Sequence, residues 1–345
     1  MIPIYKPYFD ERETKYLNDC IKSTWISSKG KYIDIFEKKV CDYIGCRYSS
    51  STSNGTTAIH LALLALGIGR GDEVITTNFT YVASTNAILM VGAKPVLTDV
   101  NPETWNIDTN LIQKKISKKT KAILVTNVYG LPCDFDHLKF ICKKYKLFLI
   151  EDAAESLGAK YYSKSSGNLA DISTLSFFGN KTITTGEGGM VLTNNKKLID
   201  KVKILKNQGN DPNIKYFHKV LGYNYRMTNM QAAIGVAQIE KIDEILKKKS
   251  NLFLRYYNSL KHICDFQIPK PNINSSFWII AVLFNSEKNK ISVQNRLSKS
   301  KIETRPFFFP IDQLPFYTSQ NDLPISKLIH KKGLCLPSFP ALRDD

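Results

Sequence analysis

The chain lacks any uninterrupted apolar run long enough to span a bilayer. Its first residues, MIPIYKPYFDERE, also lack the apolar core of a secretion signal. These two absences argue against a membrane-spanning protein and against export. We therefore expect a cytoplasmic protein with no membrane partner.

Cysteine and histidine are few and unpaired. The seven cysteines are an odd number, and they show no short paired spacing typical of a zinc site or a disulfide framework. The five histidines are scattered, without an HxxxH or HxH pattern. We expect free thiols in a reducing compartment and no bound metal.

Basic residues are plentiful, and the formal net charge is +17. The lysines are spread along the chain, mostly at helical spacing beside apolar residues, as in IQKKISKKTK and KIDEILKKKSN. Such a pattern is typical of solvated helix faces and favours them over a nucleic-acid patch. We expect no nucleic-acid partner, although the charge would attract a small anionic substrate.

Strand and helix patterns alternate after about residue 50. Short buried strands joined by helices imply crossover connections and a largely parallel sheet, so the predicted fold class is α/β with helices on both faces of the sheet. The predicted strands cover 72–78, 94–100, 121–128 and 146–154, and the predicted helices cover 80–92, 110–119 and 134–145.

A long helical pattern over 228–260 follows, and the remaining chain mixes strand-like SSFWIIAVLF with helical SVQNRLSKS. We place a domain boundary near residue 240. The prediction is a large α/β domain at 1–240 and a smaller α+β domain at 241–345.

Three segments carry residues suited to one small molecule. Lys181 precedes a glycine-rich run in SFFGNKTITTGEGGM. Asp152 follows the apolar run KLFLI and should emerge at the carboxyl edge of the sheet, where open α/β sheets bind ligands. Gly55 and Thr56 lie where STSNGTTAIHLAL enters an apolar helix, and a helix N-terminus attracts phosphate.

Each segment alone has an ordinary explanation, since Asp152 could cap the next helix and Gly55 could begin a simple core helix. No Walker or GxGxxG pattern is present, which disfavours nucleoside triphosphates and dinucleotides. Together, the three segments supply what pyridoxal phosphate requires. The lysine bonds the cofactor, the acid keeps the ring nitrogen protonated, and the helix N-terminus holds the phosphate.

Seven ordered segments of the chain resemble the sugar-nucleotide aminotransferases of the DegT/DnrJ/EryC1/StrS family. The resemblance implies an aspartate-aminotransferase-like (type I) fold and pyridoxal phosphate that alternates with pyridoxamine phosphate. It also implies a homodimer with shared active sites. The segments are STWISSKGKYIDIFEKKV, STSNGTTAIHLAL, TYVAS, EDAAESLGA, SFFGNKTITTGEGGM, GYNYRMTNMQAAIGVAQ and ETRPFFFP.

The resemblance implies a role for each matching cofactor residue. Lys181 matches the lysine that bonds the cofactor, and Asp152 matches the partner of the ring nitrogen. Tyr81 matches the ring that stacks on the cofactor, and Glu155 the residue that reaches its phenolic oxygen. The expected phosphate contacts are Gly55, Thr56 and Ser176, with Asn224 donated by the partner subunit.

Four further residues fall on the expected substrate side: Ser27, Asn127, Arg226 and Asp312. Asn127 and Asp312 stand where many relatives have a histidine, so the identity of the sugar stays open. Ordinary roles also stay open for three residues: core packing for Tyr81, a strand-end hydroxyl for Ser176, and an interface ion pair for Arg226.

The activity that the resemblance implies is transfer of an amino group from L-glutamate to C4 of a nucleotide-linked 4-keto-6-deoxyhexose. The product would be a viosamine- or perosamine-type sugar nucleotide for glycan synthesis. Glu155, where C3-aminating relatives have a glutamine, favours C4 over C3. A C3 aminotransferase and a non-catalytic cofactor-binding regulator remain alternatives, whereas Lys181 disfavours a 3-dehydratase, in which histidine replaces the lysine.

Overall fold

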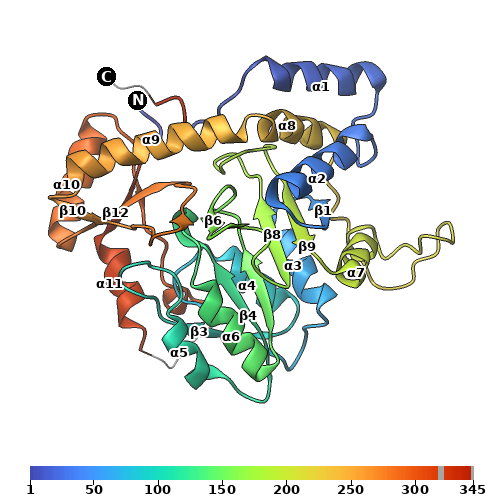
Figure 1. Ribbon diagram of the computed structural model, residues 1–345, viewed down its shortest axis with the longest axis horizontal. Helices are drawn as coiled ribbons and strands as arrows, with labels where there is room; N and C mark the ends of the chain where they lie inside the picture. The colour runs from blue at the N-terminus through green and yellow to red at the C-terminus, as the bar shows by residue number, and fades with distance from the viewer. Residues whose placement is uncertain (318–321, 343–345) are drawn as a thin grey trace.

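A seven-stranded sheet forms the centre of the protein in the computed structural model, which describes residues 1–317 and 322–342 (Figure 1). The strand order is β1-β9-β8-β5-β4-β2-β3, and β9 runs antiparallel to both of its neighbours while the other pairs are parallel. The predicted largely parallel sheet is therefore confirmed. Its strands are β1 Tyr48–Thr52, β2 Glu73–Thr77, β3 Lys94–Thr98, β4 Thr120–Thr126, β5 Phe148–Asp152, β8 Ile172–Ser176 and β9 Gly189–Thr193.

Helices cover both faces of this sheet because its strands carry apolar side chains on both sides. One face packs against α3 (Gly55–Ala65), α4 (Ala83–Met90) and α7 (Lys196–Lys206). The other face packs against α2 (Lys31–Ile44) and α8 (Asn229–Ile239) at one end, and against α5 (Thr109–Ile112) and α6 (Phe135–Tyr145) at the other.

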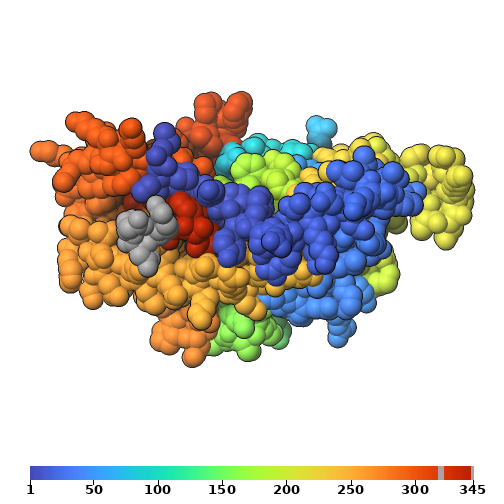
Figure 2. Space-filling model, turned by 90° about the horizontal axis from the view of Figure 1, so that it is seen from above, coloured from blue at the N-terminus to red at the C-terminus, as the bar shows by residue number. Residues whose placement is uncertain are grey.

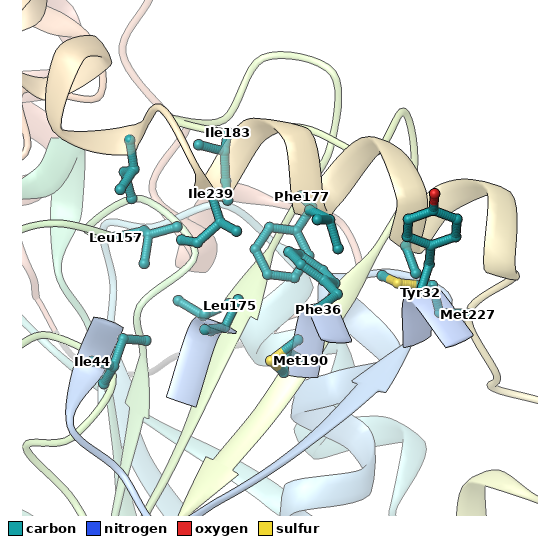
Figure 3. Packing of buried hydrophobic residues seen from close by; sticks show 14 of the residues in the cluster. Tyr32, Phe36, Ile44, Leu157, Leu175, Phe177, Ile183, Met190, Met227 and Ile239 are labelled. Carbon is teal, nitrogen blue, oxygen red and sulfur yellow. The ribbon is translucent and has the colours of Figure 1, made fainter. Parts of the chain in front are cut away.

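A cluster of aromatic and aliphatic side chains joins α2 and α8 to strands β8 and β9 (Figure 3). Phe36 of α2 lies 4.9 Å from Phe177, measured between ring centroids. Gly235 permits this packing, because a Cβ at that position would lie 2.6 Å from the Phe36 ring. The close contact between α2 and α8 therefore depends on a residue without a side chain.

The helical pattern over 228–260 forms two helices, α8 and α9 (Ile242–Leu260), where one long helix was expected. The break lies at Lys241, whose buried ammonium is 2.6 Å from Glu13 and 3.1 Å from Asp10. The ion pair with Glu13 ties the break to helix α1 (Glu11–Ser23). Ion pairing from a distant segment overrides a helical pattern that is continuous in the sequence.

The helix predicted over 110–119 is also shorter than expected. Helix α5 is followed by a 3₁₀ turn at Gln113–Lys115. Thr120, the first residue of β4, then closes a turn by donating its N–H to Ser117 O at 3.2 Å and accepting from Ser117 N at 2.9 Å. The early start of β4 leaves no room for a longer helix.

A second sheet of four antiparallel strands, in the order β10-β12-β14-β13, lies in the C-terminal part with helix α9. The N-terminus joins this part, because Ile2 bridges to Ile302 (Figure 1). The domain boundary near residue 240 stays a prediction. The elements are β10 Cys264–Phe266, β12 Ile280–Phe284, α10 Glu287–Lys299, β13 Arg305–Pro306, η3 Ile311–Gln313, α11 Pro324–Lys332 and β14 Gly333–Leu336.

Two smaller features complete the described part of the chain. A three-stranded sheet is formed by β6 (Lys160–Tyr161), β7 (Lys164–Ser165) and β11 (Ile273–Asn274). A loop between α7 and α8 projects from the molecule, and it is seen as a yellow ribbon in Figure 1 and as a yellow protrusion in Figure 2. None of the helices in residues 1–317 and 322–342 combines the length and apolarity needed to cross a membrane.

Candidate active site

A cavity of about 430 Å³ opens at the carboxyl ends of strands β4, β5 and β8. This is the edge of an open α/β sheet at which ligands bind. The structure brings together here the residues that the sequence predicted for cofactor binding within one chain. They are Gly55, Thr56, Tyr81, Asp152, Glu155, Ser176 and Lys181.

The N-terminus of helix α3 forms one wall of the cavity. Asn54 caps the helix, since its side chain accepts a hydrogen bond from Thr57 N at 2.9 Å. The first N–H groups of a helix have no acceptor within it, so this turn can receive an anion. A Cβ on Gly55 would lie 2.8 Å from the Ser176 Cβ, so the glycine allows the end of β8 to join the same wall.

Asp152 lies at the end of β5 with its carboxylate held in a fixed position. One oxygen, Oδ2, accepts from Ser84 Oγ at 2.6 Å, and the other accepts from Ala154 N at 3.1 Å. Burial raises the pKa of this carboxyl, and the hydrogen bond from Ser84 opposes the rise. The residue is oriented by its own chain before any ligand contacts it.

Lys181 extends into the cavity between an acid and an aromatic ring. Its Nζ lies 3.8 Å from Glu155 Oε1 and 3.9 Å from the centroid of the Trp278 ring. Burial lowers the pKa of the Lys181 ammonium, while Glu155 and Asp152 oppose this change. A lowered pKa increases the neutral fraction of the amine, which is the form that acts as nucleophile and base.

Glu155 is the second acid of the cavity, and it is also buried. Its Oε2 accepts from Tyr129 N at 2.8 Å. Burial raises the pKa of Glu155 to about 7, against the opposing effect of Lys181. Glu155 can therefore hold a proton near neutral pH, although an ordinary glutamate would not.

The mouth of the cavity is lined by aromatic and basic side chains. Tyr81 is 59% exposed, so it is not a core residue, and its ring centroid lies 6.1 Å from that of Phe308. Arg305 lines the same mouth, and nearly half of its side-chain surface is exposed to solvent. Arg305 forms only a loose, exposed ion pair with Glu303, at 3.8 Å, so this guanidinium and the exposed tyrosine are suited to contact a ligand that enters from solvent.

The geometry gives no support to the expected substrate role of Asn127, which stays a prediction. This residue is fully buried, and its amide nitrogen donates to Glu151, Ser156 and Ser166 within 3.0 Å. Its oxygen accepts from Cys133 N. Both polar atoms of the Asn127 side chain are hydrogen-bonded within the protein, so neither is available to a substrate in this arrangement.

The other expected substrate residues also lie outside the cavity of their own chain. Asp312 accepts from Asn78 Nδ2 at 3.0 Å and pairs with Lys327 at 3.2 Å. The backbone oxygen of Ser27 accepts from Asn229 N. Substrate contacts by Asp312 and Ser27 stay predictions without support from this geometry.

Asn224 and Arg226 lie at the base of the projecting loop, with Arg226 Nε donating to Asn224 Oδ1 at 3.1 Å. Arg226 also donates to Asn207 Oδ1 at 3.0 Å. Neither residue lines the cavity of its own chain. This placement agrees with the expectation that Asn224 serves the site of a partner subunit, which stays a prediction.

Four residues of the site escaped the sequence analysis: Ser84, Trp278, Arg305 and Phe308. Ser84, Arg305 and Phe308 lie inside the segments TYVAS and ETRPFFFP, which carried the family resemblance, so a signal for them existed. Trp278 had none, because it reaches Lys181 only through the packing of the C-terminal sheet against the large one.

Comparison with known proteins decides the family. The family model described as DegT/DnrJ/EryC1/StrS aminotransferase family matches residues 7–345. The chain belongs to this family. It is 44% identical to GDP-perosamine synthase of Escherichia coli O157:H7 over 345 residues, covering 100% of this chain and 95% of that protein. The same percentage identity is found with GDP-perosamine synthase of Vibrio cholerae, over 100% of this chain and 96% of that protein.

Solved structures of the family share the fold. Helicobacter pylori PseC, an aminotransferase involved in the biosynthesis of pseudoaminic acid, superposes with a TM-score of 0.93 at 26% identity. The match covers 98% of this chain and 94% of that one. The fold is the type I, pyridoxal phosphate-dependent fold, and the protein is an aminotransferase that uses this cofactor.

The cavity fits pyridoxal phosphate by its donor set. The N-terminus of α3, with Ser176 beside it, would hold the phosphate, the oriented carboxylate of Asp152 would pair with the ring nitrogen, and the Lys181 amine would meet the aldehyde. When bound, the cofactor accepts the amino group from the donor and stabilises negative charge at the reacting carbon. Binding, orientation and proton transfer are left to the side chains of the protein.

Proposed function

We propose that this aminotransferase transfers an amino group from L-glutamate to C4 of a GDP-linked 4-keto-6-deoxyhexose. The product is a GDP-linked 4-amino-4,6-dideoxyhexose of the perosamine type, used in glycan synthesis. The observation that carries the proposal is the 44% identity, over the full chain, to two GDP-perosamine synthases. The lysine and both acids of the cavity support a catalytic role.

Lys181 acts as the proton carrier of the reaction. Its amine, whose pKa is lowered by burial, takes a proton from the α-carbon of the donor and returns one at the sugar C4 in the second half of the cycle. Asp152, held by Ser84, keeps the ring nitrogen of the cofactor protonated. Glu155 holds a proton on its carboxyl beside the Lys181 amine.

Both substrates are anions, and they enter the same cavity in turn. Arg305 is the basic side chain at its mouth, and Trp278 and Phe308 offer apolar surface next to it. We assign Arg305 to the charged groups of the substrates and the aromatic rings to the sugar. The net charge of +17 favours the approach of a doubly charged nucleotide sugar.

The active enzyme in this proposal is a homodimer. The projecting loop carries large apolar side chains that are more than half exposed in one chain, among them Ile214, Tyr216, Phe217 and Leu221. An arm of this kind is typical of a segment that packs on a second copy. It would bring Asn224 and Arg226 to the cavity of the partner subunit. We place the dimer in the cytoplasm, in keeping with seven free cysteines.

Two alternatives would use the same cavity. A C3 aminotransferase would use the same lysine and acids, so the cavity alone does not separate it from a C4 enzyme. A cofactor-binding regulator would retain the wall formed by the N-terminus of α3 and Ser176, here called the phosphate wall. A regulator would not need the lowered pKa of Lys181 or the raised pKa of Glu155 beside it. These two shifts therefore favour catalysis.

Nitrogen-labelled glutamate tests the proposal. Purified protein with pyridoxal phosphate receives the label together with GDP-, dTDP- or UDP-linked 4-keto-6-deoxyhexose, and mass spectrometry follows the label. We expect label in the GDP-linked sugar, at a rate at least about 100-fold above the other two. A 3-keto acceptor serves as the positional control.

Label found only in the dTDP or UDP sugar would overturn the nucleotide assignment, and label only in the 3-keto acceptor would overturn C4. If no sugar is labelled but the cofactor absorbance responds to glutamate, the substrate lies elsewhere. If neither responds, the regulator is the better description.

A further inference from the structure

Lys249 is a fully buried lysine in the middle of helix α9, with 1% of its surface exposed. Its Nζ donates to the main-chain oxygens of Trp278 at 3.0 Å and Ser338 at 2.8 Å. No carboxylate forms an ion pair with it in the part of the chain that the structure describes. A lysine is rarely buried without a charged partner, so this position calls for a physical reason.

Other buried lysines of the protein have such a partner. Lys206 lies 3.4 Å from Glu37, and Lys241 lies 2.6 Å from Glu13. Burial lowers the pKa of Lys249 to about 7, so keeping a proton on this amine costs free energy. A methionine would fill a similar volume without this cost. The hydrogen bonds of Lys249 must therefore serve something other than packing.

The neighbours of Lys249 converge on the main chain of the reactive lysine. Its Nζ lies 5.1 Å from the centroid of the Tyr5 ring. The Tyr5 hydroxyl donates to the main-chain oxygen of Lys181 at 2.5 Å. Trp278 Nε1 donates to the main-chain oxygen of Asn180 at 2.6 Å. The main-chain carbonyls of Asn180 and Lys181 thus each accept a hydrogen bond from an aromatic residue. Both aromatic residues also contact the buried ammonium of Lys249.

Trp278 also contacts the reactive group itself, since its ring centroid lies 3.9 Å from Lys181 Nζ. A shift of Trp278 would change the position of the amine and the main chain that carries it. Because Lys249 holds the Trp278 carbonyl, its hydrogen bond fixes the segment from which the ring extends. The contacts run from Lys249 through Trp278 and Tyr5 to Lys181.

We propose that Lys249 is a positioning residue of the active site, which sets the place of the Lys181 amine by holding Trp278 and Tyr5 against residues 180–181. The inference rests on the role of Lys181 in the aminotransferase. It does not depend on which sugar accepts the amino group.

Lys249→Met in the full-length holoenzyme is the test, because it keeps the length of the side chain and removes its hydrogen bonds. Visible absorbance of the cofactor bound to Lys181 is recorded across pH. We expect the apparent pKa of this absorbance change to move by about half a unit or more. We expect kcat for the donor half-reaction to fall about tenfold, with KM for glutamate within about twofold, since small displacements near reacting atoms are costly.

Lys241→Met is the matched control. It also removes a buried ammonium, at the start of the same helix, and it breaks ion pairs with Asp10 and Glu13. We expect it to lower the melting temperature at least as much as Lys249→Met does, with the absorbance titration and kcat unchanged. Trp278→Phe combined with Lys249→Met should reduce kcat no further than the more severe single change, because both act through the same contact.

The proposal is overturned if Lys249→Met lowers the melting temperature but leaves the titration and kcat as in the wild type. If that variant does not fold, Tyr5→Phe and Trp278→Phe decide, since each removes one hydrogen bond to residues 180–181. Unchanged titrations in both would overturn the proposal. Because the absorbance of the bound cofactor needs no sugar, a wrong sugar acceptor does not affect the result.

Discussion

At the scale of single residues, the site depends on shifted proton affinities. Glu155 and Lys181 lie 3.8 Å apart in a buried cavity, and burial raises the pKa of the acid while it lowers the pKa of the amine. Burial thereby favours the uncharged form of both groups. An acid and an amine whose charged forms are both disfavoured by burial are suited to proton transfer and unfavourable for stability.

Glu155→Gln in the cofactor-free protein should reveal this cost. The pKa of Glu155 is raised from 4.5 to about 7 on folding, so the folded state binds more protons than the unfolded state between these values. Protonated Glu155 therefore contributes to the free energy of unfolding at low pH. This contribution, of up to roughly 3 kcal/mol, is lost as the pH rises through the window. Glutamine does not titrate. Urea unfolding should thus show Glu155→Gln gaining stability relative to wild type from pH 5 to pH 8.

A difference between the two proteins that stays constant across this range would contradict the assignment. A difference of opposite sign would mean that the ion pair with Lys181 outweighs desolvation. In that case the acid is charged in the resting site, and its proposed role as a proton holder fails.

At the scale of elements, the phosphate wall depends on how closely strand β9 approaches the turn before helix α3. Gly189 begins β9 and pairs with Thr52 at the end of β1. An added Cβ at Gly189 would collide with the main-chain oxygen of Asn54, which caps α3. The glycine therefore sets the position of the helix N-terminus.

Gly189→Ala should weaken cofactor binding about tenfold and lower the free energy of unfolding by about 1–3 kcal/mol, because backbone has to shift. Absorbance titration with pyridoxal phosphate and urea unfolding measure the two effects. Gly69→Ala is the control, since its nearest neighbour would be Val91 O at an ordinary 3.6 Å. Wild-type affinity in Gly189→Ala would show that the helix N-terminus is not set by this contact.

Sequence patterns predicted those elements and residues whose cause is local. The strand-end position of Asp152, the glycine-lined turn at Lys181 and the helix start at Gly55 each follow from neighbouring residues. Trp278 reaches the site through contacts that no local pattern contains. The break at Lys241 has the same kind of cause, since Glu13 lies far away in the sequence. The burial of Asn127 likewise depends on polar partners that lie elsewhere in the sequence.

At the scale of the whole molecule, the projecting loop makes the dimer testable. A mixed dimer is purified with two affinity tags, one chain carrying Lys181→Ala and the other Asn224→Asp. If the loop of each chain completes the site of the other, one site has both substitutions and the second has neither. We expect about half of the wild-type activity, and almost none from either variant alone.

An inactive mixed dimer would mean that each chain contributes Lys181 and Asn224 to the same site. Gel filtration at falling concentration accompanies the assay, so that loss of the dimer is distinguished from loss of a shared site.

The site also draws on both ends of one chain. Tyr5, near the N-terminus, bonds to Lys181 in the middle, and Trp278 and Ser338 complete the contacts around Lys249 from the C-terminal part. A ribosome that adds about 5–20 residues per second needs on the order of half a minute to supply them all. Until then the contacts around Lys249 and the main chain of Lys181 are incomplete. Ribosome-bound intermediates should therefore remain without cofactor, and premature termination should yield no partially active enzyme.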